Sequence, residues 1–231
     1  MTQWFLIDTP AAVTPDLAER VARHAALGDP YRLAIVDELV SSDRSPAELQ
    51  ALLGCPSNLL AHHLDVLAAA GLVTRHRSSG DGRRRYVAVV PDAYAFLMIR
   101  DRRQAQPVLF ICTANSARSQ LAAGLWRSLT NAPATSAGTH PADRVHPGAV
   151  AAGRRAGVDL SDARPAALDD VKVLPDLVIT VCDRAHEAID TPPTWLHWSI
   201  PDPVPTATPS AFDRSVRELR RRITSFVETA S

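Results

Sequence analysis

Cys112 and Arg118 form the clearest chemical motif of the sequence, a cysteine and an arginine separated by five residues. An apolar run over 107–111 precedes the cysteine and predicts a buried strand, and a helix is expected from Arg118 to about Leu129. Five residues between a strand and a helix let successive backbone N–H groups curl towards a common centre, where the helix N-terminus adds partial positive charge. The motif therefore predicts an anion-binding loop.

The side chains of this loop indicate which anion it binds and what reaction follows. An arginine can donate two parallel hydrogen bonds to a tetrahedral oxyanion, so we assign that role to Arg118. In this positive field the pKa of Cys112 is expected to fall from about 8.5 towards neutral or lower, which gives a thiolate nucleophile. The other residues predicted to line or support the site are Thr113, Ala114, Asn115, Ser116, Ala117 and Ser119, the last as a hydrogen-bond donor to the thiolate. The alternative is a structural cysteine beside a surface arginine.

The second half of the chain alternates strand-like and helical segments. Three more strands are expected, at 134–137, 176–181 and 196–200, with helices near 146–156 and 211–229. Strands that alternate with helices pair in parallel and are covered by those helices. We therefore predict an α/β domain with a central four-stranded parallel sheet.

The first half is predicted to contain short helices followed by a β-hairpin. The helices are expected over 15–27, 30–40, 46–54 and 57–70. Ser45 and Glu48 form a capping box for the third of them, and two strand-like segments flank a hairpin loop at 78–82. A helix-turn-helix followed by a hairpin is a winged helix, a mainly α fold that binds DNA.

The predicted recognition helix, 57–70, has an apolar face and a polar face. Leu60, Leu64 and Leu67 share the face that packs inward. The residues predicted to contact DNA are Ser57, Asn58, His62, Arg83, Arg84 and Arg85. The helix members of this set can hydrogen-bond base edges, whereas the three arginines beside the hairpin can contact phosphates, which position a protein without reading sequence. The alternative for His62 is a surface histidine, and the alternative for the three arginines is a solvated hairpin edge.

Three segments of the first half, 27–33, 64–73 and 83–86, together resemble ArsR-type winged-helix regulators. The resemblance covers residues 15–92 and implies a symmetric homodimer that binds a double-stranded DNA operator. Many metal-sensing members carry a Cys-x-Cys pair in the helix before Cys55, and this chain does not. A lone thiol cannot hold arsenite or a soft metal tightly, so we predict a buried structural Cys55 and no metal site.

The second half resembles the low-molecular-weight phosphatase superfamily over residues 107–229. Besides the Cys112 loop, the supporting segments are 136–139, 176–182 and 197–203. The sequence Arg-Ser-Gln that begins at position 118 and the His-Trp…Asp-Pro arrangement are most similar to the arsenate reductase branch. This resemblance implies arsenate, or a phosphate-like oxyanion, as substrate. It also implies that Asp202 is a general acid, which protonates an oxygen as it leaves the tetrahedral centre; a turn cap is the alternative.

Cys182 bears on whether the reaction is hydrolysis or reduction. A phosphatase needs water to cleave the Cys–phosphate bond, whereas a reductase needs a second thiol to supply electrons. Cys182 follows the predicted strand 176–181, and ligands of α/β sheets gather at the carboxyl ends of strands, so its thiol is expected beside the Cys112 loop. This placement favours reduction, and the alternative is a buried strand-end cysteine in a phosphatase.

Two positions depart from thioredoxin-coupled reductases. Ile189 occupies the expected place of a third cysteine, and Ala123 stands where some reductases have a glutamate at a potassium site. We therefore expect neither a three-thiol relay nor a potassium ion. We also expect no tightly bound cofactor, and regeneration by an external thiol reductant: mycothiol, glutathione with a glutaredoxin-like redoxin, or thioredoxin.

The length of 231 residues permits two small domains. We place an ArsR-type winged-helix domain at 1–92, a linker at 93–106 and a low-molecular-weight phosphatase-like domain at 107–231. The sequence has no apolar run that could cross a bilayer, no secretory layout at its start and only three cysteines. We expect a cytoplasmic protein without membrane contact.

The leading hypothesis is an arsenic-response fusion protein, in which a DNA-binding transcriptional regulator is joined to a thiol-dependent arsenate reductase. Two alternatives stay open. One is a regulator fused to a protein-tyrosine phosphatase, and the other is a non-enzymatic regulator that senses an oxyanion without turning it over.

Overall fold

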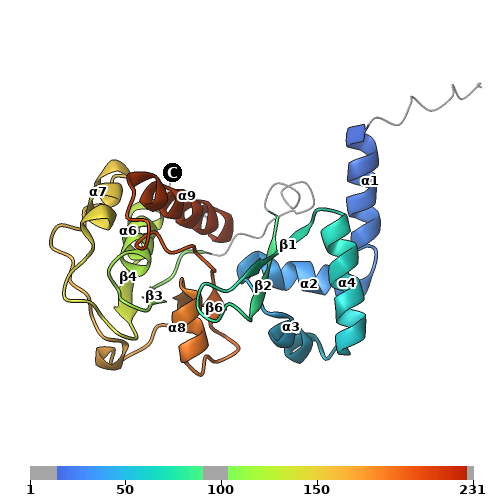
Figure 1. Cartoon of the computed structure of the whole chain (residues 1–231), viewed down its shortest axis with the longest axis horizontal. Helices are drawn as coiled ribbons and strands as arrows, with labels where there is room; N and C mark the ends of the chain where they lie inside the picture. The colour runs from blue at the N-terminus through green and yellow to red at the C-terminus, as the bar shows by residue number, and fades with distance from the viewer. Residues whose placement is uncertain (1–14, 91–103, 228–231) are drawn as a thin grey trace, which may run out of the picture.

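A computed structural model describes residues 15–90 and 104–227, which form two halves lying side by side (Figure 1). The linker predicted at 93–106 falls for the most part outside these ranges. Among the helices within them, none has the length and apolar character needed to span a membrane.

The first half is a winged helix, as predicted. Its helices are α1 (Pro15–Leu27), α2 (Pro30–Ser41), α3 (Pro46–Leu53) and α4 (Ser57–Ala69), and its strands β1 (Val73–Arg77) and β2 (Arg85–Val89) pair antiparallel. The predicted capping box is confirmed: Ser45 Oγ accepts from the Glu48 N–H, and the Glu48 carboxylate accepts from the Ser45 N–H at 2.6 Å. These bonds satisfy two N–H groups that would otherwise lack partners at the helix end.

The second half is an α/β domain whose four-stranded sheet is parallel throughout, in the order β4-β3-β5-β6, which confirms the predicted fold class. Its strands are β3 (Val108–Cys112), β4 (Ala134–Gly138), β5 (Leu177–Thr180) and β6 (Leu196–His197). Its helices are α6 (Arg118–Thr130), α7 (Pro147–Arg155), α8 (Asp183–Ala188) and α9 (Pro209–Phe226), with a 3₁₀ turn, η1 (Leu168–Asp170).

Two elements differ from the sequence-based expectation. The strand expected over 196–200 keeps only its first two residues in the sheet, because the backbone then turns towards the first half, where the Ser199 N–H donates to Asp43 Oδ2 at 2.8 Å. Helix α8, which starts directly after Cys182, was not predicted. Six residues are too few to show a helical period.

Each half has its own apolar core. Strand β3 lies at the centre of the second core, and its side chains are buried along its whole length. Leu39, Leu49, Leu64 and Leu67 belong to the core of the first half. Separate cores of this kind allow each half to hold its own fold, so the contact between the halves needs its own explanation.

The halves are joined by a buried polar interface centred on Asp43. Its carboxylate, 1% exposed, accepts two hydrogen bonds at 2.8 Å from the guanidinium of Arg222 on α9. Its backbone N–H donates to the carbonyl of His197 at 2.7 Å, and the Trp198 indole N–H donates to the carbonyl of Ser41. A carboxylate buried this deeply is tolerated because a charged partner and backbone donors surround it.

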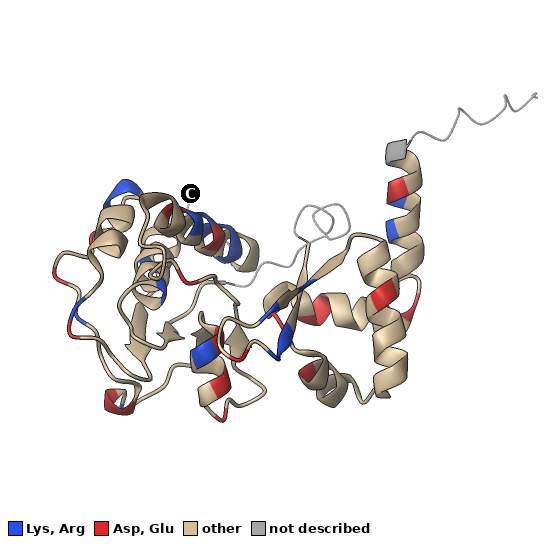
Figure 2. Cartoon of the chain, in the orientation of Figure 1, with Lys and Arg blue, Asp and Glu red and all other residues tan. Residues whose placement is uncertain are grey.

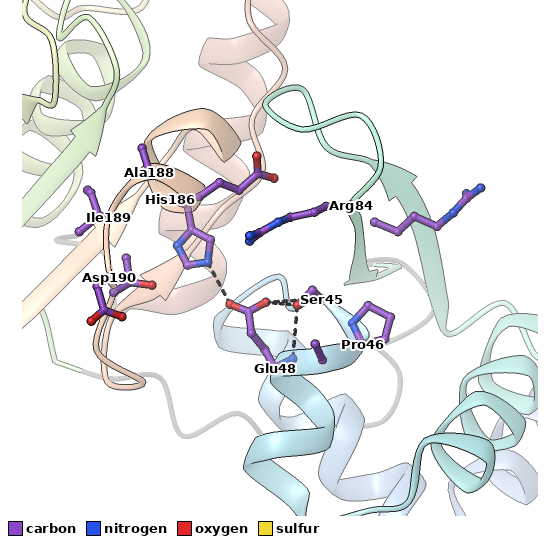
Figure 3. Close-up of a pocket in the computed structure, with 12 residues that line it drawn as sticks. Ser45, Pro46, Glu48, Arg84, His186, Ala188, Ile189 and Asp190 are labelled. Carbon is purple, nitrogen blue, oxygen red and sulfur yellow. Dashed lines mark hydrogen bonds and ion pairs between the residues drawn. The ribbon is translucent and has the colours of Figure 1, made fainter.

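A second contact joins α3 to α8. Glu48 Oε1 lies 3.0 Å from His186 Nε2, and Figure 3 shows this pair on the wall of a cavity between the halves. The cavity measures about 780 Å³. Burial opposes ionisation of Glu48, but the hydrogen bonds from His186 and Ser45 outweigh it and lower the pKa of that carboxyl to about 2. Helix α8 is therefore held by the first half as well as by its own sheet.

We predict that Asp43→Asn lowers the free energy of unfolding by about 3 kcal/mol, because it leaves the Arg222 charge buried without its main partner. Urea unfolding of the full chain measures this change. The control is Asp213→Asn, which removes an exposed pair with Arg155 and should cost less than about 1 kcal/mol. Equal effects of the two variants would contradict a buried interface.

Candidate active site

The segment between β3 and α6 is a tight loop whose shape depends on Asn115. This residue has a φ of 47°, in the left-handed region that asparagine tolerates better than most residues. Its side-chain amide donates to Ser119 Oγ at 2.8 Å, and its carbonyl oxygen accepts from Gln120 Nε2 and the Ala166 N–H. Gly138 lies against the loop, since a Cβ there would meet the Thr113 carbonyl oxygen at 2.7 Å. The curled backbone is thus fixed by its neighbours.

The sulfur of Cys112 lies inside this curl. It accepts a hydrogen bond from the Asn115 N–H at 3.2 Å and lies 3.0 Å from Ser119 Oγ, the contact that the sequence predicted. Burial raises the pKa of the Cys112 thiol, while the charge of Arg118 and the hydrogen bond from Ser119 act in the opposite direction. The predicted fall of this pKa towards neutral is therefore wrong, because desolvation of the sulfur outweighs the two favourable contacts.

Arg118 is buried at the start of α6, and its guanidinium connects two parts of the site. One nitrogen donates to the Ile200 carbonyl at 3.0 Å and the other lies 3.0 Å from Asp202 Oδ2. The other carboxylate oxygen of Asp202 accepts from the Val204 N–H. The arginine and the aspartate that the sequence singled out, 84 positions apart in the chain, are thus in direct contact.

Cys182 lies immediately before α8, with its sulfur 3.2 Å from Thr113 Oγ1. Both Cys112 and Cys182 are free thiols, and both line one cavity of about 150 Å³ together with Arg118 and Asp202. The four residues predicted to carry the chemistry therefore meet in one pocket.

The loop residues divide into two groups. Thr113, Ala114, Ser116 and Ala117 line the cavity, as predicted. Asn115 and Ser119 do not line it and are fully buried behind the loop, where they hold its shape and contact the sulfur. Of the six predicted loop residues, four thus line the cavity and two support the loop from behind.

Comparison with known proteins gives the family. Residues 107–230, more than half of the chain, match the family described as low molecular weight phosphotyrosine protein phosphatase. The chain belongs to this family. A second family, described as a helix-turn-helix domain, matches residues 27–76. A helix-turn-helix region is therefore fused to a low-molecular-weight phosphatase-family domain.

Several curated relatives of the phosphatase-family domain are arsenate reductases. The arsenate reductase of Brevibacillus brevis is 35% identical over 127 residues, which cover 53% of this chain and 94% of the relative. That of Bacillus licheniformis is 38% identical over 133 residues, and that of Bacillus subtilis 35% over 133; both alignments cover 53% of this chain and 95% of the relative. The alignments cover nearly the full length of these relatives.

The helix-turn-helix region presents α4 to solvent. Ser57, Asn58 and His62 are exposed on it, whereas Leu60, Leu64 and Leu67 are buried, which is the division of faces that the sequence predicted. Helix α4 carries Asp65 but neither lysine nor arginine, and it is drawn mostly in tan in Figure 2. Phosphate contacts from lysine or arginine side chains must therefore come from other elements of this half. Cys55 is buried in the core of this half, as predicted for a structural thiol.

The arginines of the hairpin lie close to the second half. Arg83, Arg84 and Arg85 are all exposed, but Arg84 and Arg85 line the large cavity between the halves, and Figure 3 shows Arg84 extending towards His186. Their assignment as phosphate contacts remains a prediction.

Three residues of the smaller, phosphatase-family cavity were missed by the sequence analysis: Ser79, Arg184 and Val204. Arg184, on α8, lies two positions after Cys182, and this proximity could have marked it. Ser79 comes from the hairpin loop of the other half, and nothing in its local sequence indicates that it reaches this pocket. The site of this family member therefore includes part of the helix-turn-helix region.

We predict opposite shifts of the Cys112 pKa in three variants. Arg118→Met and Ser119→Ala should raise it further, because each removes a group that stabilises the thiolate, whereas Cys182→Ser should lower it, because the neighbouring Cys182 opposes ionisation of Cys112. The rate of iodoacetamide labelling of Cys112 against pH, read by peptide mass spectrometry, measures the three values. A shift of the same sign in all three variants would contradict this account of the site.

Proposed function

We propose that the second half is a thiol-dependent arsenate reductase with Cys112 as its nucleophile, and that the first half is a DNA-binding transcriptional regulator of the ArsR type. The main support for the enzymatic proposal is that two free thiols, Cys112 and Cys182, line one small cavity together with Arg118 and Asp202. The arsenate reductases among the relatives of this half support the choice of substrate.

In the first step, loop N–H groups and the Arg118 guanidinium bind the arsenate oxygens, and Cys112 Sγ attacks arsenic. The thiol proton of Cys112 is lost in this step as the sulfur–arsenic bond forms. The departing arsenate hydroxyl takes up one proton and leaves as water, with Asp202 placed to pass that proton on. The product is a covalent Cys112–arsenic(V) ester.

In the second step, Cys182 Sγ attacks Cys112 Sγ. A sulfur–sulfur bond forms, the sulfur–arsenic bond breaks, and its electron pair stays on arsenic, which is thereby reduced from As(V) to As(III). The proton of Cys182 is released to an oxygen of the departing arsenite. In sum, one arsenate and two thiols give one arsenite, one water and one disulfide.

An external thiol reductant must then restore the two thiols. We propose that a dithiol of the thioredoxin type attacks the Cys112–Cys182 disulfide directly, because both sulfurs line the same cavity and the only other cysteine, Cys55, is buried in the first half. Mycothiol or glutathione with a glutaredoxin-like redoxin is the other class of donor.

For the first half we propose that α4 enters the major groove of an operator, with Asn58 and His62 reading base edges. The exposure of both residues beside a buried leucine face supports this orientation. Helix α1 extends away from the body of the protein in Figure 1 and exposes Val21, which supports α1 as the contact of a symmetric homodimer.

We predict that arsenate oxidises the purified protein with two thiols lost per arsenite formed, and that Cys112→Ser abolishes this reaction. Cys182→Ser should also abolish arsenite formation unless external thiol is added, whereas Cys55→Ser should behave as the wild type. Thiol titration and arsenite quantification measure both products. Rapid hydrolysis of p-nitrophenyl phosphate with no arsenite formed would point to a phosphatase, and arsenate binding without either product would point to a sensor.

We predict that Asn58→Ala weakens binding to a duplex from the promoter of the chain's own gene by about 1–3 kcal/mol, because a base contact is lost. Arg83→Ala should instead weaken binding to all duplexes and reduce the slope of affinity against salt by about 1. Fluorescence anisotropy at several salt concentrations separates the two effects. Unchanged affinity of Asn58→Ala for the promoter duplex would exclude α4 as the reading helix.

A further inference from the structure

The hairpin loop of the first half packs directly on the helix that follows Cys182. We call residues Ser78–Asp81 of this loop the wing tip. The Ser79 N–H donates to Asp183 Oδ2 at 2.6 Å, and the Asp81 N–H donates to Glu187 Oε2 at 2.6 Å. The Ser78 hydroxyl donates to the other oxygen of Glu187 at 2.5 Å. The wing tip thus contacts α8 near both of its ends.

The fit between the wing tip and α8 leaves no free space at Gly80. A Cβ on Gly80 would lie 2.8 Å from both the Cα and the backbone nitrogen of Arg184, so the helix backbone itself would have to move. Gly82, in the same loop, has nothing within 4 Å of its would-be Cβ. The close approach is therefore specific to the wing tip.

Cys182 is bonded to the part of α8 that the wing tip contacts. Asp183 is the next residue, and the Cys182 carbonyl accepts the hydrogen bond from the His186 N–H that begins the helix. Ser79 also lines the cavity that holds the sulfurs of Cys112 and Cys182. A displacement of the first turn of α8 would therefore change the position of the second thiol relative to the first.

The other contacts of Asp183 show that its position is defined from both halves. Its second oxygen, Oδ1, lies 3.2 Å from Nε2 of the buried His197, whose other ring nitrogen lies 2.8 Å from Thr180 Oγ1 on β5. The sheet thus holds one oxygen of this carboxylate, and the wing tip holds the other. Without the wing tip, the carboxylate of Asp183 in the first turn of α8 would keep its contact with His197 but lose its hydrogen bond from the Ser79 N–H.

We propose that the wing tip positions Cys182 for attack on Cys112, so that the first half of the chain contributes to the second step of the reaction. Ser79 and Gly80 are positioning residues in this account. The role of the wing tip in arsenate reduction rests on the proposed function. Its effect on the geometry of the two thiols can be tested without arsenate. Small misplacements of reacting groups have large effects on rate, of about 100-fold for roughly 1 Å.

The first measurement is the equilibrium of the Cys112–Cys182 disulfide with oxidised and reduced dithiothreitol, in the full chain and with no arsenate present. We expect Gly80→Ala to disfavour the disulfide about 10- to 100-fold, since the equilibrium reports how well the two sulfurs are placed. Ser78→Ala adds no bulk and removes two hydrogen bonds, the one to Glu187 and the one from the Gly80 N–H, and should act in the same direction. Gly82→Ala is the matched control and should equal the wild type.

The second measurement separates positioning from general damage. The rate of iodoacetamide labelling of Cys112, taken in a Cys182→Ser background, reports the Cys112 loop alone and should be unchanged by Gly80→Ala. If Gly80→Ala and Ser78→Ala leave the disulfide equilibrium at the wild-type value, or if Gly80→Ala impairs the Cys112 loop as much as the disulfide, the proposal is overturned. Absence of arsenate-dependent thiol loss in the wild type would instead reject the proposed function, and the dithiothreitol result would stand on its own.

Discussion

The chemistry of this protein depends on two parallel strands that end side by side. Strands β3 and β5 pair in register from Val108 with Leu177, and the hydrogen bond from the Val181 N–H to the Ile111 carbonyl continues the pairing to the edge of the sheet. Cys112 and Cys182 are the next residues along their strands, so sheet pairing brings two thiols 70 positions apart to one cavity. Any reaction step that needs both sulfurs depends on this pairing, because each of the two loops carries only one of the thiols.

The burial that accompanies this arrangement makes the Cys112 thiol harder to ionise. Desolvation raises the pKa of Cys112 although Arg118 and Ser119 oppose it. The pocket also holds the Arg118 guanidinium, whose charge attracts a bound oxyanion more strongly in partly buried surroundings than in water. Asp202, in contact with Arg118 at the mouth, belongs to the same charge arrangement.

The two halves are packed through charged and polar groups rather than through a continuous apolar surface. Asp43 with Arg222, Glu48 with His186 and the wing tip with α8 are three separate contacts across this boundary. Buried polar contacts of this kind are sensitive to geometry, because a partner that moves leaves a charge unsatisfied. In this arrangement α4 lies on the side of the first half that faces away from the second half (Figure 1), while the hairpin loop contacts α8 and lines the Cys112 cavity through Ser79. The first half therefore exposes the polar face of α4 to solvent and contributes Ser79 of its hairpin loop to the pocket.

Local patterns in the sequence determined much of this protein. The spacing of Cys112 and Arg118 after an apolar strand predicted the loop, the strand–helix alternation predicted the parallel sheet, and the leucine face of α4 predicted which side of that helix is buried. These signals were readable because each depends on neighbours within a few residues. Only the tertiary structure decided the direction of the Cys112 pKa, the role of Asn115 behind the loop, and the presence of Ser79 at the pocket. Desolvation and contacts between distant segments depend on the packed three-dimensional surroundings, which no local pattern encodes.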